Sequence, residues 1–438
     1  MYNKELSESA TLNLTGHYTK GRGFFEQLRF QDDVDFYFPG VPEFVGLTSD
    51  LVRRRWLDND FLGGIANLEL TPSSALAVTL GGAYNIYLGD HFGQVISIED
   101  AALPSDIEYY RSDATKAEAN GYIKADYKLS DKIELFGDVQ LRNISYEAEG
   151  LDSDRTVIGR SAGGIDTSYV FFNPKAGITY NLVPGKSVFA SYAAAQREPV
   201  RSDFLDAVGT RVPNVEKLHD FELGYRSSTS NLSYEANAYY QYYIDQLVVT
   251  GAVNDVGAAV RTNVDRSYRL GLELSAKWNV TEYFSWQPNM TISQNKISEF
   301  VEEISDFDNG GLQQNTFLNS DIAFSPSVIA GSIFTYHITP SFDASLLSKY
   351  VGRQFLDNTS NESRSISPYT VQDIQLRYKI ETELIQEIEF KLLVNNVLNA
   401  RYSSNGYSYS YIFGGLITEN YLYPQAGTNF LLSASVMF

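Results

Sequence analysis

Strict alternation of apolar and polar residues over long segments constrains the fold of this 438-residue chain more than any other feature. Between residues 232 and 245, one set of alternate positions is apolar or aromatic, and the set between them is mostly polar. The first set consists of Leu232, Tyr234, Ala236, Ala238, Tyr240, Tyr242 and Ile244. A period of two predicts a β-strand with one apolar face. The segment is longer than the roughly 5 to 6 residues of a typical strand in a soluble protein, and it matches the roughly 10 residues of a tilted strand that crosses a bilayer.

The same alternation recurs in residues 132–142, 374–381 and 430–438, and the chain ends on the aromatic residue Phe438. Apolar and polar residues also alternate in the strands of a soluble β-sandwich, but those strands are shorter and their polar face is the outer one. An aromatic ring at the end of an apolar face suits a lipid–water boundary. We therefore predict an all-β transmembrane antiparallel β-barrel, with the apolar face toward lipid and the polar face toward the lumen.

Composition agrees with a single β unit over residues 1–438. No composition break, linker or stretch of helical periodicity divides the chain, and no run of about 18 apolar residues could form a membrane-spanning helix. The 31 tyrosines and 26 phenylalanines suit strands and the aromatic girdles of a barrel. The absence of cysteine excludes disulfides, thiol nucleophiles and thiolate metal sites.

Turn signals alternate with longer polar and aromatic stretches. The short turns are predicted at residues 71–74, 129–132, 183–186, 227–231, 280–282, 339–341 and 382–383. The long loops are predicted at residues 19–54, 90–112, 149–167, 197–215, 246–264, 299–322, 353–368 and 399–423. Tight turns at one rim and long loops at the other are typical of outer-membrane barrels, and the count predicts about sixteen strands.

The charge balance is acidic, with 34 Lys and Arg against 54 Asp and Glu, a formal net charge of -20. This excess argues against nucleic acid as a partner, because phosphate binding needs cations. Two interpretations of the acidity stay open: solvated loops and lumen walls, or an electrostatic preference for cationic or metal-bearing solutes.

Candidate catalytic chemistry is sparse. The four histidines, His17, His91, His219 and His337, lie far apart without the spacing of metal ligands. No histidine stands in a convincing nucleophile context, so we predict no enzyme, no metal site and no cofactor.

Several segments resemble the barrel of TonB-dependent outer-membrane receptors, particularly the iron-complex type of Bacteroidetes-like bacteria. They are Arg53 to Gly64, Phe171 to Gly177 with Ser191-Tyr192 and Arg197-Glu198-Pro199, Asn395 to Tyr402, Tyr423 to Phe430, and the terminal Phe438. The most specific segment resembles the family's Asn-Leu-Phe-Asp-x-x-Tyr motif. Its candidate motif residues, with those of the closing segment, are Asn396, Leu398, Asn399, Tyr402, Gly427 and Phe438. Leu398 stands where the family prefers Phe, Asn399 where it prefers Asp, and Thr428 where many members have Arg.

The resemblance implies a transporter that takes up a scarce solute with energy delivered through TonB. Barrels of this kind have about 22 strands and a plug inside the lumen. Because about sixteen strands and no plug are visible, we interpret residues 1–438 as the C-terminal part of such a barrel, with the plug and first strands missing. Residues 1–8 show no secretory signal. The implied partners are outer-membrane lipid, TonB through the missing N-terminal region, the barrel-assembly machinery and a small-molecule metal chelate.

Arginines beside aromatic residues in the long loops are the candidate substrate-binding residues. They are Tyr37, Arg53, Arg55, Trp56, Arg197, Arg201, Tyr407 and Tyr409. Arginine next to aromatic rings can hold an anionic, partly aromatic chelate by charge and stacking. The structural alternative is that these arginines pair with neighbouring aspartates and hold the loops together.

We therefore predict an outer-membrane TonB-dependent receptor that imports a ferric siderophore or a similar chelate, with cobalamin, haem and glycans left open. The rival interpretations are a passive porin of about sixteen strands and a surface barrel that transports nothing. Phe438 resembles the terminal signal that the assembly machinery reads, so its removal is expected to impair membrane insertion.

Overall fold

The computed structural model describes residues 1–102, 107–158, 164–207, 212–254, 257–381 and 385–437. Within these residues the protein contains 22 strands, two short α-helices and one short 3₁₀ helix. No helix in this described part is long and apolar enough to cross a membrane. The chain forms two compact units, Met1–Tyr127 with Phe136–Pro174, and Lys128–Leu135 with Lys175–Phe438.

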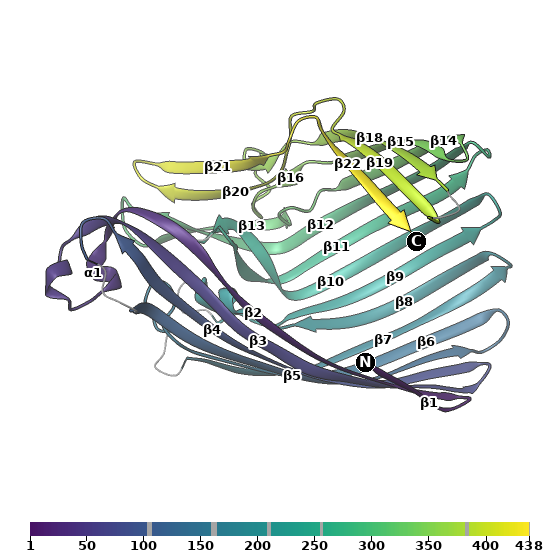
Figure 1. The fold of residues 1–438 in the computed structure, drawn as a ribbon, viewed down its shortest axis with the longest axis horizontal. Helices are drawn as coiled ribbons and strands as arrows, with labels where there is room; N and C mark the ends of the chain where they lie inside the picture. The colour runs from purple at the N-terminus through teal and green to yellow at the C-terminus, as the bar shows by residue number, and fades with distance from the viewer. Residues whose placement is uncertain (103–106, 159–163, 208–211, 255–256, 382–384, 438) are drawn as a thin grey trace. The chain divides into compact units, whose positions relative to one another are not determined.

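In the first unit, consecutive strands from β1 to β5 pair antiparallel, as the purple and blue ribbons of Figure 1 show. The elements are β1 (Tyr2–Ser7), β2 (Ala10–Asp33), α1 (Val34–Tyr37), the 3₁₀ helix η1 (Pro42–Phe44), β3 (Thr48–Ser73), β4 (Leu76–Ile98), and most of β5 (Glu108–Lys128) and β6 (Ile133–Gly150). The first part of β7 (Ile165–Val183) also belongs to this unit.

In the second unit, β7 to β12 pair consecutively, and the antiparallel ladder continues through β14, β15, β18, β19 and β22. The ladder strands after β7 are β8 (Lys186–Arg197), β9 (Glu216–Ser228), β10 (Leu232–Val253), β11 (Ala259–Asn279), β12 (Phe284–Asp306), β14 (Val328–Thr339), β15 (Phe342–Val351), β18 (Tyr369–Ile380), β19 (Glu387–Asn395) and β22 (Asn429–Met437). The connections contain α2 (Arg201–Leu205), β13 (Leu312–Asp321), β16 (Gln354–Phe355), β17 (Ser365–Ile366), β20 (Ser403–Ile412) and β21 (Leu416–Pro424).

The predicted all-β antiparallel architecture is confirmed, but the predicted count of about sixteen strands was too low. The six additional strands are β1, β13, β16, β17, β20 and β21, none longer than ten residues. Apart from β1, they lie in the long connections. They were missed because a strand without a lipid-facing side does not need the long apolar alternation by which the others were recognised. Six of the seven predicted short turns join consecutive ladder strands, whereas residues 382–383 lie in a segment outside the described residues.

The predicted loop over residues 19–54 was wrong for most of its length. Strands β2 and β3 remain paired along their length, from the pair of Ala10 with Leu70 to the pair of Asp33 with Thr48. Only the residues between Asp33 and Thr48 form a connection. Charged residues enter the exposed face in this region, among exposed apolar ones such as Phe24 and Phe30: Lys20 lies 2.9 Å from Asp60. A bilayer needs only about 9 to 11 residues of each strand. The strands are therefore longer than the hydrocarbon layer requires, and they continue as a paired hairpin that carries both charged and aromatic residues.

The predicted two faces of β10 agree with its exposure pattern. On the apolar face, Tyr234 and Tyr240 are 39% and 38% exposed, whereas Asn237 on the other face is 9% exposed. Across the ladder, Ala236 lies opposite Leu274 of β11, so the apolar face continues from strand to strand. This arrangement exposes apolar side chains on the outside, as a lipid-facing wall requires.

Aromatic side chains gather near the short-turn ends of the second unit's strands. Trp278 of β11 and Trp286 of β12 have ring centroids 6.5 Å apart, and Trp286 stacks on Phe334 of β14 at 5.5 Å. Amphipathic aromatic rings are typical of the interface between lipid and water. This row therefore marks the edge of the apolar band in the second unit.

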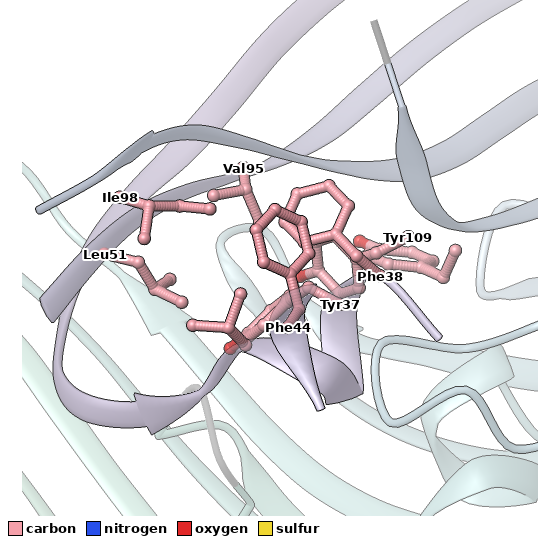
Figure 2. Close-up of a cluster of buried hydrophobic side chains, with 9 residues drawn as sticks. Tyr37, Phe38, Phe44, Leu51, Val95, Ile98 and Tyr109 are labelled. Atoms are coloured by element: carbon pink, nitrogen blue, oxygen red, sulfur yellow. The ribbon is translucent and has the colours of Figure 1, made fainter. Parts of the chain in front are cut away.

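The buried hydrophobic clusters lie near the long-loop ends of the strands. In the first unit, residues from α1, η1 and the strand ends pack together, as Figure 2 shows. This cluster consists of Val34, Tyr37, Phe38, Phe44, Leu51, Val95, Ile98, Tyr109 and Tyr110. In the second unit, a separate cluster consists of Val248, Val264, Ile297, Phe300 and Ile322. These small cores give the long connections fixed positions.

Replacing Ala236 with arginine tests which face of β10 meets lipid. A cation on the apolar face near the middle of the bilayer should cost about 2–4 kcal/mol of stability. Asn237→Arg is the matched control, because residue 237 lies directly across from Glu273 on the other face. We expect Ala236→Arg to lower the temperature at which the barrel unfolds on a heat-modifiability gel and Asn237→Arg to leave it nearly unchanged. Equal losses would contradict the assignment.

Candidate binding site in the long loops

A cavity of about 810 Å³ lies at the long-loop ends of the second unit's strands. Five parts of the chain form its walls: the connection after β8, the facing ends of β10 and β11, the end of β12, the loop that carries β16 and β17, and strand β20. These parts are far apart in sequence, and the strand ladder holds them together. The cavity is therefore the best-formed candidate binding site in the described part of the chain.

An ion pair between Arg261 and Asp203 fixes one wall. Asp203 lies in the short helix α2 and is 4% exposed. The guanidinium of Arg261 donates two hydrogen bonds of 2.8 Å to its two carboxylate oxygens. Two-point pairing of this kind is strong and fixes orientation. It ties the connection after β8 to strand β11.

A second arginine, Arg364, holds the opposite wall. Its guanidinium donates to Asp357 at 2.9 Å and to Glu302 of β12, and it reaches Thr418 of β21 at 3.3 Å. Arg364 and Asp357 are both buried. Because removing one partner of a buried pair leaves an uncompensated charge, this contact stabilises the loop against β12 and the hairpin. The loop is tied down further by the side chain of Asn358, which donates to Val249 O at 2.7 Å.

Carboxylates dominate the charged lining of the cavity. The acidic residues are Asp203, Asp245, Asp265, Glu299, Glu302, Glu303 and Asp357. The only basic residues among the described lining are Arg261 and Arg364, which the two ion-pair systems above already engage. The lining therefore gives the cavity a negative electrostatic potential.

A cluster of tyrosines around Glu419 covers one face of the hairpin β20–β21. The backbone of this hairpin is drawn in yellow in Figure 1. The hydroxyls of Tyr409 and Tyr411 each donate a 3.0 Å hydrogen bond to Glu419, and Tyr421 donates to the same carboxylate. The rings also stack: Tyr407 lies 4.8 Å from Tyr421, centroid to centroid. Tyr409 and Tyr411 carry this aromatic face to the cavity wall.

The shared carboxylate is stabilised in its ionised form. Hydrogen bonds from Tyr421, Tyr411 and Tyr409 lower the pKa of Glu419 below its usual value. The same bonds raise the pKa of each tyrosine, because they are lost when the phenol ionises. The cluster is therefore most ordered when Glu419 is charged and the three tyrosines are neutral.

The predicted substrate-binding residues of the second unit have different positions. Tyr409 lines the cavity, whereas Tyr407 stacks behind it on Tyr421 and is absent from the described lining. Arg197 forms an ion pair with Glu216 at 3.1 Å, and Arg201 is the first residue of α2. Neither arginine borders the cavity in the described part of the chain.

The predicted residues of the first unit belong to a polar and aromatic cluster of their own. Tyr37 is buried, and its hydroxyl donates to Asp32 at 2.7 Å (Figure 2 shows its ring in the core). Arg53 donates to Gln27 at 2.7 Å and to the Tyr37 hydroxyl at 3.2 Å. Burial, with the hydrogen bond to Asp32, raises the pKa of Tyr37 to about 12. These two side chains stabilise the loop.

The neighbouring residues Arg55 and Trp56 are also engaged within the first unit. Arg55 donates to Ser153 Oγ at 2.8 Å. Trp56 lies between two rings, with centroids 4.6 Å from Phe24 and 5.9 Å from Phe92, and the guanidinium of Arg22 lies 5.1 Å from its ring. The cation on the Trp56 ring is therefore Arg22, a residue that is not among the predicted ones.

The motif residues form a compact connection between the last strands. Asn396 is buried with φ 48°, and its side chain donates to Ala400 O at 2.9 Å and Ala426 O at 3.1 Å. A Cβ at Gly427 would lie 2.5 Å from Asn399 Oδ1, so only glycine fits there without a shift. Tyr402 stacks on Tyr369 of β18 at 4.5 Å.

Two further motif residues are placed differently. Leu398 is 69% exposed and makes little contact, and Phe438 lies outside the described residues. The motif thus joins β18, β19 and β22 through Asn396, Asn399, Tyr402 and Gly427.

Sequence reasoning missed Arg261, Arg364 and Glu419. Asp203 lies 58 residues from Arg261 and Glu302 lies 62 residues from Arg364, and no local pattern connects either pair; the other partner of Arg364, Asp357, is seven residues away within an irregular loop. Glu419 did leave a signal: Gly414-Gly415 is a hairpin turn sequence, and both residues have positive φ. Folding the chain back at this turn places Glu419 opposite Tyr409.

The ladder, the outward apolar face and the loop-borne cavity together define an outer-membrane β-barrel of the receptor class. The family model described as "TonB dependent receptor-like, beta-barrel" matches residues 2–426. The chain belongs to the TonB-dependent receptor family and is a protein of the outer membrane of Gram-negative bacteria. The family and the fold are those of receptors and transporters.

Similar proteins are consistent with this assignment. The pesticin receptor of Yersinia enterocolitica is 26% identical over 195 residues, which are 44% of this chain and 26% of that receptor. The siderophore receptor PiuA from Acinetobacter baumannii has a TM-score of 0.68 at 15% identity, covering 99% of this chain and 62% of PiuA. The copper transporter OprC has a TM-score of 0.72 at 14% identity, covering 98% of this chain and 63% of OprC. These structures share the fold, and the chain spans less than two thirds of their length.

Replacing Asn396 with alanine should destabilise the barrel by roughly 2–4 kcal/mol. The change removes a buried amide that satisfies several backbone groups, and it places alanine at a positive φ. Leu398→Ala is the matched control two residues along, because Leu398 is mostly exposed. The unfolding temperature on a heat-modifiability gel should fall for Asn396→Ala alone. A similar response of the two variants would show that Asn396 does not hold the last strands.

Acidification should loosen the β20–β21 hairpin. The pKa of Glu419 is lowered in the folded hairpin, so its contribution is complete above the ordinary glutamate pKa of about 4.3 and is lost as the pH falls through the lowered value. Hydrogen exchange of the β20–β21 amides, corrected for intrinsic rates, should accelerate below about pH 4. In Glu419→Gln the exchange should be faster at neutral pH and lack this acid step. An acid step retained in Glu419→Gln would assign it to another group.

Proposed function

We propose that this chain forms the wall and part of the external binding site of a receptor that imports a scarce solute across the outer membrane. A ferric siderophore or a similar metal chelate is the proposed solute. The observation that carries the proposal is the cavity of about 810 Å³ at the long-loop ends of a TonB-dependent receptor barrel. Its volume falls within the roughly 300–1,000 Å³ of small-molecule sites.

The names of the similar proteins support a metal-bearing solute. They include a siderophore receptor, a ferric-catecholate import receptor and a copper transporter. The proposed common element is a complexed metal ion, which is too large to cross a membrane unaided and too dilute to enter usefully through an open pore.

Direct contact with the solute is proposed for Tyr409, which borders the cavity. Tyr407, Arg197 and Arg201 are proposed to act at its margin, where small movements of the hairpin and of α2 would bring them to a bound chelate. In the first unit, Tyr37, Arg53, Arg55 and Trp56 are proposed to hold a second stretch of long-loop surface in a form that can contact the solute. Arg261 and Arg364 keep the cavity walls in position.

The energy for import and the remaining parts of the receptor are proposed to come from outside the described fold. A plug domain and a segment that contacts TonB are expected to accompany the barrel, because the solved receptors are longer than this chain. TonB would release the solute from its site into the lumen. Outer-membrane lipid would cover the apolar face, and the barrel-assembly machinery would insert the protein.

Deleting the chromosomal gene that encodes this chain in its source bacterium tests the proposal. We expect growth under iron limitation to depend on the gene and uptake of radioiron-labelled chelates to fall at least tenfold, to the level of cells without TonB. The control is the same deletion complemented with the intact gene. Uptake that persists without TonB, together with a steady ohmic conductance of the purified gene product in lipid, would contradict import by a receptor and support a passive porin.

A further inference from the structure

Four oxygen-bearing side chains converge at one point of the β20–β21 hairpin. The Tyr409 and Tyr411 hydroxyls lie 3.0 Å from the Glu419 carboxylate, one on each of its oxygens, and the Tyr421 hydroxyl contacts the same carboxylate. Because side chains alternate along each strand, these residues share one face of the hairpin, with Tyr409 directly opposite Glu419. Three phenol oxygens are therefore gathered around the two carboxylate oxygens.

The protein itself supplies no cation to this cluster. The hydrogen-bond donors of the Glu419 carboxylate are the three tyrosine hydroxyls, and no described Lys or Arg forms an ion pair with it. Tyr409 and Tyr421 are 40% and 43% exposed, so the cluster can be reached from solution. Tyr409 and Tyr411 also border the cavity. The cluster is an accessible, negatively charged part of the cavity wall.

The hairpin that carries the cluster is anchored to its surroundings. At its turn, the Gly414 N–H donates to the Asp308 carboxylate at 2.8 Å, and on β21 the side-chain amide of Asn420 donates to Ser363 O at 2.9 Å. These bonds tie the hairpin to the turn after β12 and to the loop that carries β16 and β17. A fixed backbone keeps the distances between side chains, as a metal site requires.

Phenol and carboxylate oxygens are ligands for hard, highly charged cations. Ferric iron is such a cation, and tyrosine is one of the side chains that hold iron in proteins. Around a small octahedral cation such as Mg²⁺, with metal–oxygen distances of about 2.0–2.1 Å, neighbouring ligand oxygens lie about 2.9 Å apart. The 3.0 Å spacing between the Tyr409 and Glu419 oxygens is close to this distance. The four side chains therefore suit a shared ion with little movement.

The cluster differs from the metal sites that the sequence prediction considered. That prediction of no metal site rested on the spacing of histidines, and tyrosine ligands leave no such spacing. Among the described residues, no group of three or more His, Asp or Glu side chains could hold a metal ion. A site for iron in this part of the chain therefore depends on phenol oxygens.

We propose that Tyr409, Tyr411, Tyr421 and Glu419 form a ferric-ion site that binds the iron of a chelate whose coordination sphere is not filled. Glu419 supplies charge and an oxygen ligand, and the tyrosines supply phenolate oxygens. This inference rests on the proposed function, because the imported chelate is the source of the iron. It narrows the solute to weak ferric complexes with exchangeable ligands, since a chelate that fills every position leaves no place for a phenolate.

The binding step is a ligand exchange without a change of oxidation state. Each phenol that binds iron loses its proton to water, and the phenolate oxygen forms a bond to iron. The bond from iron to one weak ligand of the chelate, such as a water molecule, breaks at the same position. Iron remains ferric, so the step requires neither an oxidant nor a reductant.

The test titrates the purified product of the intact gene, in detergent at neutral pH, with ferric nitrilotriacetate. This chelate leaves coordination positions open. A phenolate bound to ferric iron absorbs visible light by charge transfer, and resonance Raman excitation in that band enhances the vibrations of the phenolate ring. We expect a saturable visible band with these vibrations.

Removing the three hydroxyls should abolish the band while keeping the rings. In the variant Tyr409→Phe, Tyr411→Phe, Tyr421→Phe, the apparent affinity for iron should fall by at least about tenfold. The matched control is Tyr283→Phe, Tyr336→Phe, Tyr423→Phe, which removes three hydroxyls from tyrosines that are 54%, 53% and 45% exposed. The control should bind iron as the unmodified protein does. Equal heat-modifiability shows that both variants fold.

Three results would overturn the inference: no visible band in the unmodified protein, a band of equal strength in the variant without the three hydroxyls, or an equal loss in both variants. The titration of the unmodified protein decides the question even if a variant fails to fold. The proposed import function survives these results when radioiron uptake still depends on the gene and on TonB. Iron binding with the expected band, together with uptake that is independent of the gene, would support the site and contradict import. The two failures are therefore distinguishable.

Discussion

The structure depends on one constraint: inside hydrocarbon, every backbone N–H and C=O group must find its partner within the protein. The antiparallel ladders from β1 to β5 and from β7 to β22 satisfy it for the strands between their ends, whereas in the described residues β1 pairs only with β2 and β22 only with β19. Once the backbone is paired, the side chains of each strand can differ completely on the two faces. One face can be apolar for lipid, and the other can carry polar groups such as Asn237 and Glu273.

The same ladders make the external site possible. Strands such as β2 and β3 continue well beyond the length that a bilayer requires, and ion pairs such as Lys20–Asp60 appear there on their outer faces. In the second unit, the strand ends carry connections whose positions are fixed by buried pairs, Arg261 with Asp203 and Arg364 with Asp357. The rigid wall thus supports loops that would otherwise lack a core, and the cavity forms between them.

The sequence predicts the wall better than the site. Alternation located the ladder strands and the two faces of β10, because lipid imposes the same pattern on every spanning segment. The pattern stops where the strands leave the membrane, and for this reason residues 19–54 were interpreted as a loop although most of them are paired. The motif around Asn396 and Gly427 could be recognised because its geometry requires particular residues at fixed positions.

The cavity could not be derived from the sequence in the same way. Its charge depends on which arginines are already engaged, and the pairing of Arg261 with Asp203 or Arg364 with Glu302 is a property of the tertiary structure. The net acidity of the chain left two interpretations open, and the position of acidic residues such as Asp245, Asp265 and Glu299 in the cavity lining became visible only in the structure.

The most direct test of the account is a cysteine scan of residues 233–242 with a fluorescent label, because the chain has no native cysteine to remove. In proteoliposomes, labels at 234, 236, 238 and 240 should be quenched by a lipid-soluble quencher, and labels at 235, 237, 239 and 241 by a water-soluble one. Quenching without this alternation, or access from water at every position, would contradict the claim that one face of each strand meets lipid.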